Sequence, residues 1–289
     1  MREVEQRRTW LITGCSTGLG RALAEYVLGL GDLVVVTARK LDDIKDFEQR
    51  YPDQVRVLEL DVSKAESITA LAAQIEASKI SIDVLVNNAG YGYLAAIEEG
   101  EDDEIRALFE TNTFGLFALT RAILPGMRTR ATGHIVNITS VAGLVGNPGS
   151  GYYAASKFAV EGFSEALAKE VRPLGIDVTI VEPGPFRTDW AGRSLVQSKR
   201  IVDAYSDTSG KRRSEVPSYS GLQMGDPARA AAAIVAAVNA TTPPLHLILG
   251  QAGLANVQRK LDGLRTDIEN WKGVTMGADF PKGSELPAK

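Results

Sequence analysis

The sequence has very few residues of the types that form disulfides or hold metal ions. Its 289 residues include one cysteine, Cys15, and two histidines, His134 and His246. A single cysteine excludes an intramolecular disulfide and is typical of proteins in a reducing compartment such as the cytoplasm. Because nitrogen and sulfur ligands are so scarce, we predict no metal site. We expect Cys15 and His134 to be structural residues.

Long apolar runs and an excess of one charge are also missing. The chain has 36 acidic and 32 basic residues, a formal net charge of -4, so no general electrostatic attraction to nucleic acid or anionic membranes is expected. Its first eight residues are charged and contain no apolar signal-peptide core. The alanine-rich run from Ala228 to Ala240 is too short to span a bilayer. These absences predict a cytoplasmic protein without nucleic-acid or membrane partners.

The residues that are present alternate between strand-like and helix-like patterns. The expected strands are Thr9–Thr13, Leu33–Thr37, Val55–Leu60, Asp83–Val86, His134–Thr139, Ile176–Val181 and Leu245–Leu249. The expected helices are Leu19–Leu30, a segment from Ser63, Asp102 to about Met127 with a break at Pro125-Gly126, Gly151–Val171, Pro227–Ala240 and about Leu254–Trp271. Repeated βα units predict one doubly wound α/β Rossmann domain over residues 1–289, with a seven-stranded parallel sheet and helices on both faces. Ligands should then bind beyond the carboxyl ends of the strands.

A glycine-rich turn follows the first expected strand. Gly14, Gly18 and Gly20 have the spacing G-x-x-x-G-x-G, which permits a tight turn and close approach of a pyrophosphate to backbone N–H groups. The helix that begins near Leu19 would add the positive end of its dipole. This pattern favours dinucleotide binding over a simple strand–helix connection. The turn residues expected at the cofactor are Gly14, Ser16, Thr17, Gly18, Leu19 and Gly20.

The end of the second expected strand bears on the choice of dinucleotide. An NAD-binding chain usually has an acidic residue here for the ribose 2′-hydroxyl, whereas this chain has Ala38, Arg39 and Lys40. The planar guanidinium of Arg39 suits the oxygens of a 2′-phosphate. We therefore predict NADP(H) in preference to NAD(H); a solvated basic turn is the alternative.

Tyr153 and Lys157 are candidates for acid–base chemistry. They lie four residues apart on an expected helix and so share one face. A lysine charge ~4 Å away at an effective dielectric of ~20 contributes up to ~4 kcal/mol, which would lower the tyrosine pKa from ~10 toward ~7, with desolvation opposing part of the shift. Such a phenol can exchange a proton with a ketone or an alcohol. Tyr152 lies ~100° away around the helix and has no lysine four residues later.

These residues, taken in order, resemble the short-chain dehydrogenase/reductase family. The resemblance covers about Thr9 to Thr188, and the GYGYLAAIEE stretch and TARK turn are most similar to the branch containing 17β-hydroxysteroid dehydrogenase type 1. Its motifs are the glycine turn, Asn87-Asn88-Ala89-Gly90, Asn112, Ser140, Tyr153-x-x-x-Lys157 and Pro183-Gly184.

The resemblance implies a role for each matched residue. Ser140 and Tyr153 would polarise a substrate carbonyl, Lys157 would also hold the nicotinamide ribose, and Asn112 would hold a water in a proton relay to Lys157. For Asn112 the alternative is a satisfied core amide, and for Ser140 a turn cap. Asp61 would accept from the adenine amino group, or else cap the next helix. The remaining expected cofactor contacts are Val62, Asn88, Ala89, Gly90, Pro183 and Gly184.

We therefore expect an NADP(H)-dependent oxidoreductase that interconverts a ketone or aldehyde and an alcohol. The segment of about 186–224 should form a substrate lid over an apolar pocket that suits an apolar or aryl carbonyl compound; the alternative is a remote surface insertion. Rival functions are a 3-oxoacyl-carrier reductase and a non-catalytic NADP-binding regulator. A helical tail of about 251–289 should follow, and we expect a homodimer or homotetramer.

Overall fold

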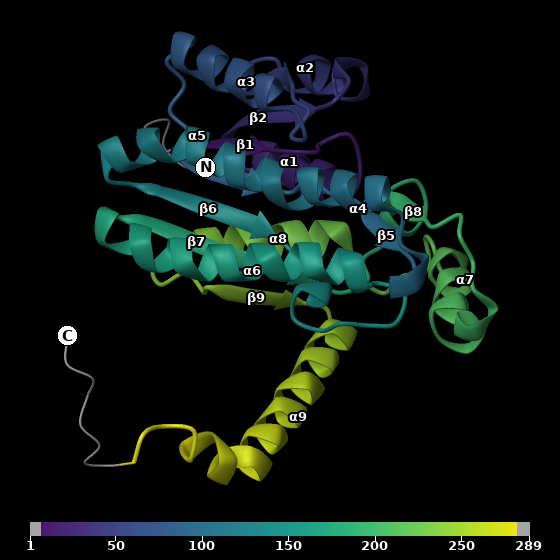
Figure 1. Ribbon diagram of the computed structural model, residues 1–289. Coiled ribbons are helices and arrows are strands. Elements are labelled where there is room, and N and C mark those ends of the chain that lie inside the picture. Colours follow the sequence, from purple (N-terminus) through teal and green to yellow (C-terminus); the bar gives the residue numbers. More distant parts are fainter. Residues whose placement is uncertain (1–6, 282–289) are drawn as a thin grey trace.

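A seven-stranded parallel sheet runs through the centre of the protein in the order β3-β2-β1-β4-β6-β7-β9 (Figure 1). The structure, a computed structural model, describes residues 7–281; the predicted tail residues 282–289 lie outside that range. The strands are β1 (Thr9–Ile12), β2 (Leu33–Ala38), β3 (Val55–Glu59), β4 (Val84–Asn87), β6 (Gly133–Ile138), β7 (Ile176–Pro183) and β9 (His246–Leu249). The predicted doubly wound sheet is confirmed.

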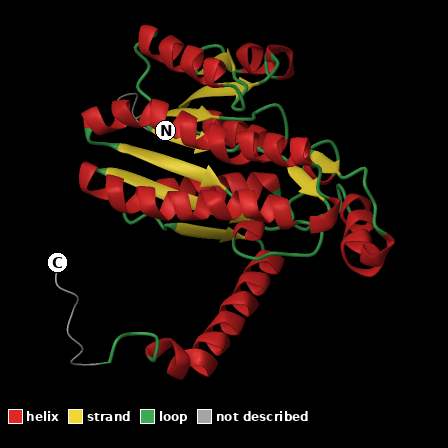
Figure 2. Cartoon of the chain, viewed as in Figure 1, coloured by secondary structure: helices red, strands yellow, loops and turns green. Residues whose placement is uncertain are grey.

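Helices cover both faces of this sheet (Figure 2). The helices are α1 (Gly18–Gly29), α2 (Asp46–Arg50), α3 (Ala65–Ala77), α4 (Asp102–Phe109), α5 (Gly115–Arg130), α6 (Gly151–Val171), α7 (Lys211–Ser218), α8 (Pro227–Val238) and α9 (Gln251–Met276). Helices α1 and α8 pack on one face, and α3, α5 and α6 pack on the other.

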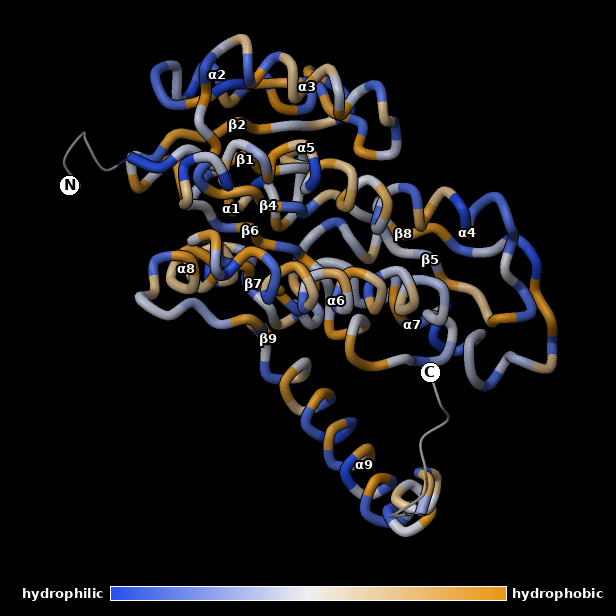
Figure 3. The backbone as a smooth tube through the Cα atoms, turned by 60° about the vertical axis from the view of Figure 1, so that its left-hand side comes forward, coloured by the Kyte–Doolittle hydropathy of each residue, from blue (hydrophilic) through white to orange (hydrophobic). Residues whose placement is uncertain are grey.

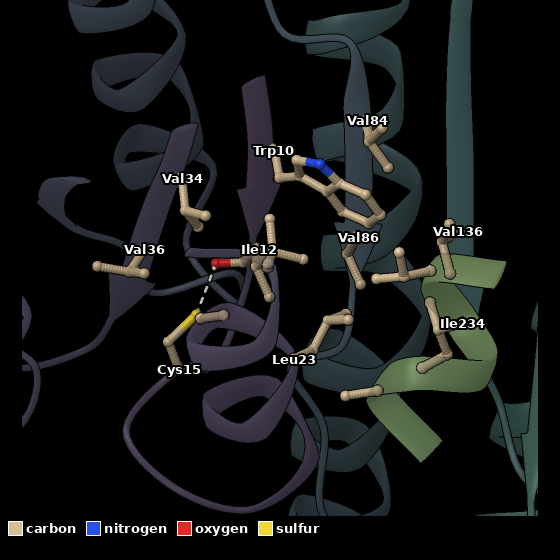
Figure 4. Close-up of a cluster of buried hydrophobic side chains, with 14 of the residues drawn as sticks. Trp10, Ile12, Cys15, Leu23, Val34, Val36, Val84, Val86, Val136 and Ile234 are labelled. Atoms are coloured by element: carbon tan, nitrogen blue, oxygen red, sulfur yellow. Dashed lines mark hydrogen bonds between the residues drawn. The ribbon is translucent and has the colours of Figure 1, made fainter. Parts of the chain in front are cut away.

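Strand alternation divides the core between the two faces. Trp10 and Ile12 of β1 join the cluster beneath α1 and α8, whereas Leu11 between them joins the cluster on the opposite face. Figure 4 shows Trp10 and Ile12 with Leu23 of α1 and Ile234 of α8. Because helices cover both faces of the sheet, a ligand cannot bind on either face. The carboxyl ends of the strands are where ligands bind in such sheets.

Two features of the fold differ from the sequence prediction. The expected helix break at Pro125-Gly126 is wrong, since α5 continues through Pro125 to Arg130. Ile123 and Met127 of α5 are buried on the sheet, and this packing outweighs the ~3 kcal/mol cost of an internal proline. A small two-stranded sheet of β5 (Gly92–Leu94) and β8 (Leu195–Gln197) was also not predicted.

The last helix, α9, leaves the body of the protein and extends away from it (Figure 1). Only its first two turns contain buried residues, Gly253 and Val257. Within residues 7–281, no helix combines the length and the apolar character that crossing a membrane requires.

Candidate functional site

The glycine turn lies where the strand order reverses, between β1 and β4. Gly14 and Gly18 have φ values of +71° and +63°, which favour glycine, and α1 begins at Gly18. The Thr13 hydroxyl accepts hydrogen bonds from the backbone N–H groups of Asn88 and Ala89, both at 2.9 Å. This network joins the turn after β1 to the turn after β4, so Asn88, Ala89 and Gly90 are held beside the glycine turn.

The two residues expected to recognise the adenosine half lie at the ends of β2 and β3. Arg39 is exposed directly after β2. Asp61 follows β3, and its carboxylate accepts from the N–H of Ser63 at 3.0 Å and from its hydroxyl at 2.7 Å. The N-cap of α3 is Lys64, so Asp61 closes a turn before the helix rather than capping it. Val62 is buried against Gly115 at the start of α5.

Tyr153 and Ser140 meet beyond the carboxyl end of β6. Tyr153 lies in the first turn of α6 and is buried, with the Ser140 hydroxyl close enough to lower the pKa of its phenol. Ser140 also accepts from the backbone N–H of Ala142 at 3.1 Å, so it caps the short helix Val141–Gly143 as well. Both side chains therefore lie at the end of β6, and the turn cap considered as the alternative for Ser140 is also present.

The side chains of Lys157 and Asn112 both lie close to Gly90, in the turn after β4. The Lys157 ammonium is buried and donates to the carbonyl of Ile138 at 2.9 Å. A methyl group placed on Gly90 would lie 3.5 Å from the Lys157 Nζ and 3.0 Å from the Asn112 Oδ1. Gly90 therefore lies between these two side chains, and only a residue without a Cβ leaves that space open.

Asn112 lies in a π-helical turn, Glu110–Phe114, between α4 and α5. Such turns are frequent at functional sites. Its amide accepts from the Tyr91 N–H at 3.0 Å, donates to the Tyr91 carbonyl at 2.9 Å, and donates to the Ser156 hydroxyl at 3.2 Å. The side chain thus connects the turn after β4 to α6, which makes it a fully bonded amide next to Lys157.

Burial controls the ionisation of both candidate acid–base residues. It raises the pKa of Tyr153 to about 12, and the nearby Ser140 hydroxyl offsets only part of this. The expected lowering of the Tyr153 pKa toward ~7 is therefore wrong for this structure. Burial also lowers the pKa of Lys157 to about 8, opposed by the charge of Glu161. At neutral pH the site holds a neutral phenol and a protonated lysine.

Two buried carboxyl groups, contributed by α6 and β7, lie next to a histidine of β9. Glu161 of α6 and Glu182 of β7 are both buried, and His246 of β9 contacts Glu182 at 2.7 Å through Nδ1. Neither carboxylate oxygen of Glu161 has a hydrogen-bond partner within residues 7–281, because the nearby Thr139 hydroxyl donates to the Val181 carbonyl. Burial raises the pKa of Glu161 to about 7.

The turn after β7 brings Pro183 and Gly184 to the same edge of the sheet. The N–H of Gly184 donates to the Leu249 carbonyl at 2.9 Å, and Gly184 packs closely against Gly253 of α9. The Ser140 hydroxyl lies 3.5 Å from the Pro183 carbonyl. The predicted Pro-Gly turn therefore adjoins Ser140.

The 186–224 segment contacts both parts of the site. The Trp190 ring lies 5.3 Å from the Tyr153 ring, centroid to centroid, and Thr188 lies beside Gly18. Arg193 donates to the Thr17 hydroxyl at 2.8 Å, a contact that the sequence analysis missed. The segment contains short helices (Asp189–Ala191, Asp203–Tyr205, Ser206–Gly210 and α7) and the strand β8.

Cys15 and His134 have structural environments. Cys15 is buried beneath the glycine turn, where burial raises the pKa of its thiol to about 12, and its sulfur contacts the Ile12 carbonyl (Figure 4). His134 is buried on β6 beside the Thr179 hydroxyl, and burial lowers the pKa of its imidazole to about 4. A buried thiol of this kind is inert.

Comparison with known proteins identifies relatives over nearly the whole chain. The family model described as short chain dehydrogenase matches residues 8–199. The chain is 34% identical over 272 residues to oxidoreductase BOA17 of Botryotinia fuckeliana, which covers 94% of this chain and 99% of the relative. A short-chain dehydrogenase from Streptomyces avermitilis superposes with a TM-score of 0.91 at 42% identity, covering 96% of this chain and 100% of that one. A metagenomic short-chain oxidoreductase in complex with NADP has a TM-score of 0.59 at 33% identity, covering 62% and 83% of the two chains.

Proposed function

Because this chain belongs to the short-chain dehydrogenase/reductase family of oxidoreductases, we propose that it interconverts a ketone or aldehyde and an alcohol with NADP(H). The observation that carries this proposal is the meeting of Ser140, Tyr153 and Lys157 beyond the end of β6. Burial disfavours the charged form of Lys157, so a purely structural core gains little from a lysine at this position. The presence of all three polar groups favours catalysis over a non-catalytic NADP-binding regulator.

The glycine turn fits a dinucleotide. Gly14 and Gly18 take positive φ values, and α1 presents its free N–H groups to the same space, which suits a pyrophosphate. We propose that Ser16, Thr17, Leu19, Gly20, Asp61, Val62, Asn88, Ala89, Gly90, Pro183 and Gly184 complete this cofactor site, with Arg39 at the 2′-phosphate. The bound nicotinamide would supply a hydride to the carbonyl carbon.

Side chains of the protein bind the substrate's carbonyl oxygen and protonate it. Ser140 and Tyr153 donate hydrogen bonds to the carbonyl oxygen, and Tyr153 gives up its proton as the alcohol forms. Its raised pKa keeps the phenol protonated before reaction, which suits it to act as the acid in the direction of reduction. The Lys157 cation, one helical turn after Tyr153 on α6, would stabilise the phenolate that results. Asn112 links the turn after β4 to α6 through Tyr91 and Ser156.

We propose that the 186–224 segment is a lid over the nicotinamide end of the site. Trp190 against Tyr153 and Arg193 on Thr17 support this proposal. Trp190 and Leu195 both lie against Gly92, so this wall is apolar and suits an apolar or aryl carbonyl compound. A 3-oxoacyl-carrier thioester is the second candidate substrate, because Arg193 and Arg200 of the segment are exposed and could meet an acidic carrier.

Replacement of Tyr153 by phenylalanine tests the proposed chemistry. The packing is kept and the proton donor is lost, so kcat should fall by ~10²–10⁴-fold. The affinity for NADPH, measured by its fluorescence, should stay within about twofold. Tyr152→Phe is the matched control, since its hydroxyl donates to the Ile97 carbonyl and lies outside the site. A Tyr153→Phe variant with more than about a tenth of the wild-type kcat would show that another group is the acid.

Steady-state kinetics with both cofactors tests the NADP(H) assignment. We expect NADPH to be preferred over NADH by roughly 5–150-fold in kcat/KM, the value of a paired charge on the 2′-phosphate. Arg39→Ala should remove most of this preference, whereas Lys45→Ala, in which a neighbouring exposed cation paired with Asp42 is removed, should not. The same assay with aryl ketones, polyols and a 3-oxoacyl-carrier thioester identifies the substrate class. Equal efficiency with both cofactors would contradict the assignment.

A further inference from the structure

The free part of α9 carries a regular apolar stripe. Its apolar residues are spaced alternately three and four apart, at Leu254, Val257, Leu261, Leu264, Ile268 and Trp271. This is the a/d pattern of a coiled coil, sustained over almost three heptads. Figure 3 shows the resulting alternation of apolar and polar segments along the helix. An ordinary terminal helix would place such a stripe on the body of its own domain.

Most of this stripe is not covered by the body of the protein. Val257 is buried at the base of the helix, but Leu261, Leu264, Ile268 and Trp271 are between 47% and 63% exposed. The helix is about 39 Å long and points away from the body (Figure 1). Seven of the large exposed apolar side chains of the described residues lie on it: Leu254, Leu261, Leu264, Ile268, Trp271, Val274 and Met276. A patch of this kind marks an interaction site.

We propose that α9 pairs with α9 of a second copy of this chain as an antiparallel two-helix coiled coil. In this register Leu261 packs against the partner's Leu264 on both sides of a twofold axis. Outward from the axis, Leu254 meets the partner's Trp271, whereas Val257 stays buried against its own body. The outer part of each helix thus covers the base of the other, where Leu254 is accessible. Such a self-complementary contact is the ordinary interface of a C2 dimer.

The charges beside the stripe favour the antiparallel arrangement. Residues at g positions face g positions across an antiparallel pair, so Lys260 lies opposite the partner's Asp267, twice by symmetry. The e positions bring Arg265 to the partner's Gln258, and no like charges meet. In a parallel pair, where g faces e, Lys260 would face the partner's Arg265. Shifting the antiparallel register by one heptad would instead oppose Asp267 to the partner's Asp267.

The polar face of α9 argues against a membrane as the occupant. This face has four basic and three acidic residues, so its net charge is only +1. They are Arg259, Lys260, Arg265 and Lys272 on the basic side and Asp262, Asp267 and Glu269 on the acidic side. Helices that lie on anionic membranes have polar faces rich in lysine and arginine. A mixed-charge face suits a solvent-exposed side of a protein–protein helix pair instead.

The mass of the full-length protein, measured by sedimentation velocity over a range of concentrations, tests this pairing. Leu264→Asp places a charge in the central layer and should weaken the association by at least about 100-fold, halving the mass at micromolar concentration. Thr266→Asp, on the outer face, is the matched control and should not change the mass. Circular dichroism of both variants reports whether the fold is kept. An unchanged mass for a folded Leu264→Asp variant overturns the proposal.

Charge exchange distinguishes the two orientations. In the antiparallel pair, Lys260→Glu and Asp267→Lys should each weaken association by about 3- to 10-fold, and the double variant should restore it. In a parallel pair Lys260→Glu would strengthen association, because it would face the partner's Arg265, and this result would overturn the proposed orientation. Flotation with vesicles of phosphatidylcholine and phosphatidylserine is the third arm. Vesicle binding by a protein that stays monomeric would replace the second copy with a membrane.

Discussion

Two buried glutamates, Glu99 and Glu161, have opposite environments in two neighbouring regions of the molecule. Glu99 lies under the 186–224 segment, where its carboxylate accepts from the N–H groups of Ala96 and Val202, both at 2.9 Å, and pairs with Arg213. Glu161 lies on α6 one turn after Lys157, and neither of its carboxylate oxygens is hydrogen-bonded within the described part of the chain. The two carboxylates are therefore buried to a similar extent, but only that of Glu99 is stabilised by hydrogen bonds and a close ion pair.

The comparison assigns different tasks to the two regions. Burial of Glu99 disfavours its charged form, but two backbone N–H groups and Arg213 outweigh this effect and lower its pKa. The carboxylate thus attaches the 186–224 segment to the loop after β5. Burial raises the pKa of Glu161 to about 7, so α6 holds an acid that titrates near neutral pH one helical turn from Lys157. A buried acid with a raised pKa, offset only in part by His246 at 3.8 Å, is a pattern often found at functional sites.

The two glutamates also predict opposite dependence of stability on pH. The folded pKa of Glu99 is lowered, so its contribution is present above its ordinary pKa of 4.5 and is lost as the pH falls through the lowered value. The folded pKa of Glu161 is raised, so its contribution is present below 4.5 and is lost as the pH rises through about 7.

The largest effect is expected from Glu99→Gln. The change keeps the shape of the side chain but leaves the Arg213 guanidinium, 11% exposed, without its charge partner. Breaking a buried ion pair in this way costs about 3–5 kcal/mol, and the loss should fall on the 186–224 segment first. Limited proteolysis should therefore cut that segment faster, and urea denaturation should show the lower free energy of unfolding.

The neighbouring Glu98→Gln is the matched control for this prediction. Glu98 is exposed and, among residues 7–281, accepts only from the Tyr205 hydroxyl at 2.9 Å, so its replacement should change stability by less than about 0.5 kcal/mol. Equal proteolysis rates for the two variants would mean that Glu99 does not hold the segment in place.

Glu161→Gln should act in the opposite direction. The amide resembles the protonated acid, and it removes the need to protonate a buried carboxylate when the chain folds above pH 7. A shift from 4.5 to about 7 corresponds to a stabilisation of about 3 kcal/mol at pH 8 and to almost none below pH 4.5. Urea denaturation at pH 4.5 and pH 8 measures both values. A variant that is less stable than the wild type at pH 8 would show that the Glu161 charge is compensated.

The part of the site that the sequence predicted is the part encoded locally. The glycine turn, Ser140 and the Tyr153–Lys157 pair follow from spacing within one turn or one helix, and the structure brings the last three together. The sheet was predictable as well, because each strand is a short apolar run between turn residues. What local spacing could not predict was the burial of Tyr153, and burial reversed the expected direction of its pKa shift.

Contacts between segments that are far apart in the chain could not be predicted from the sequence either. Arg213 pairs with Glu99 across 114 positions, and Arg193 contacts Thr17 across 176 positions. A single sequence shows a basic run or a hydroxyl residue in a turn but not the partner that each will meet. The same reason explains the missed pairing of β5 with β8, two three-residue strands that are too short to show a period.

The smallest expected effect concerns Arg193, the second attachment of the 186–224 segment. Its guanidinium is exposed and donates to the Thr17 hydroxyl in the glycine turn, so it lies where a cofactor pyrophosphate would bind. An exposed charge-assisted contact contributes about 0.5–1 kcal/mol, so Arg193→Ala should raise the dissociation constant for NADPH by about 2- to 5-fold. Because screening weakens such contacts, the ratio should shrink at high salt. Arg200→Ala is the matched control, and titration of both variants with NADPH at low and high salt measures the effect. If both variants bind NADPH like the wild type at low salt, Arg193 does not contact the cofactor. The 186–224 segment is then held in place by Glu99 rather than by Arg193.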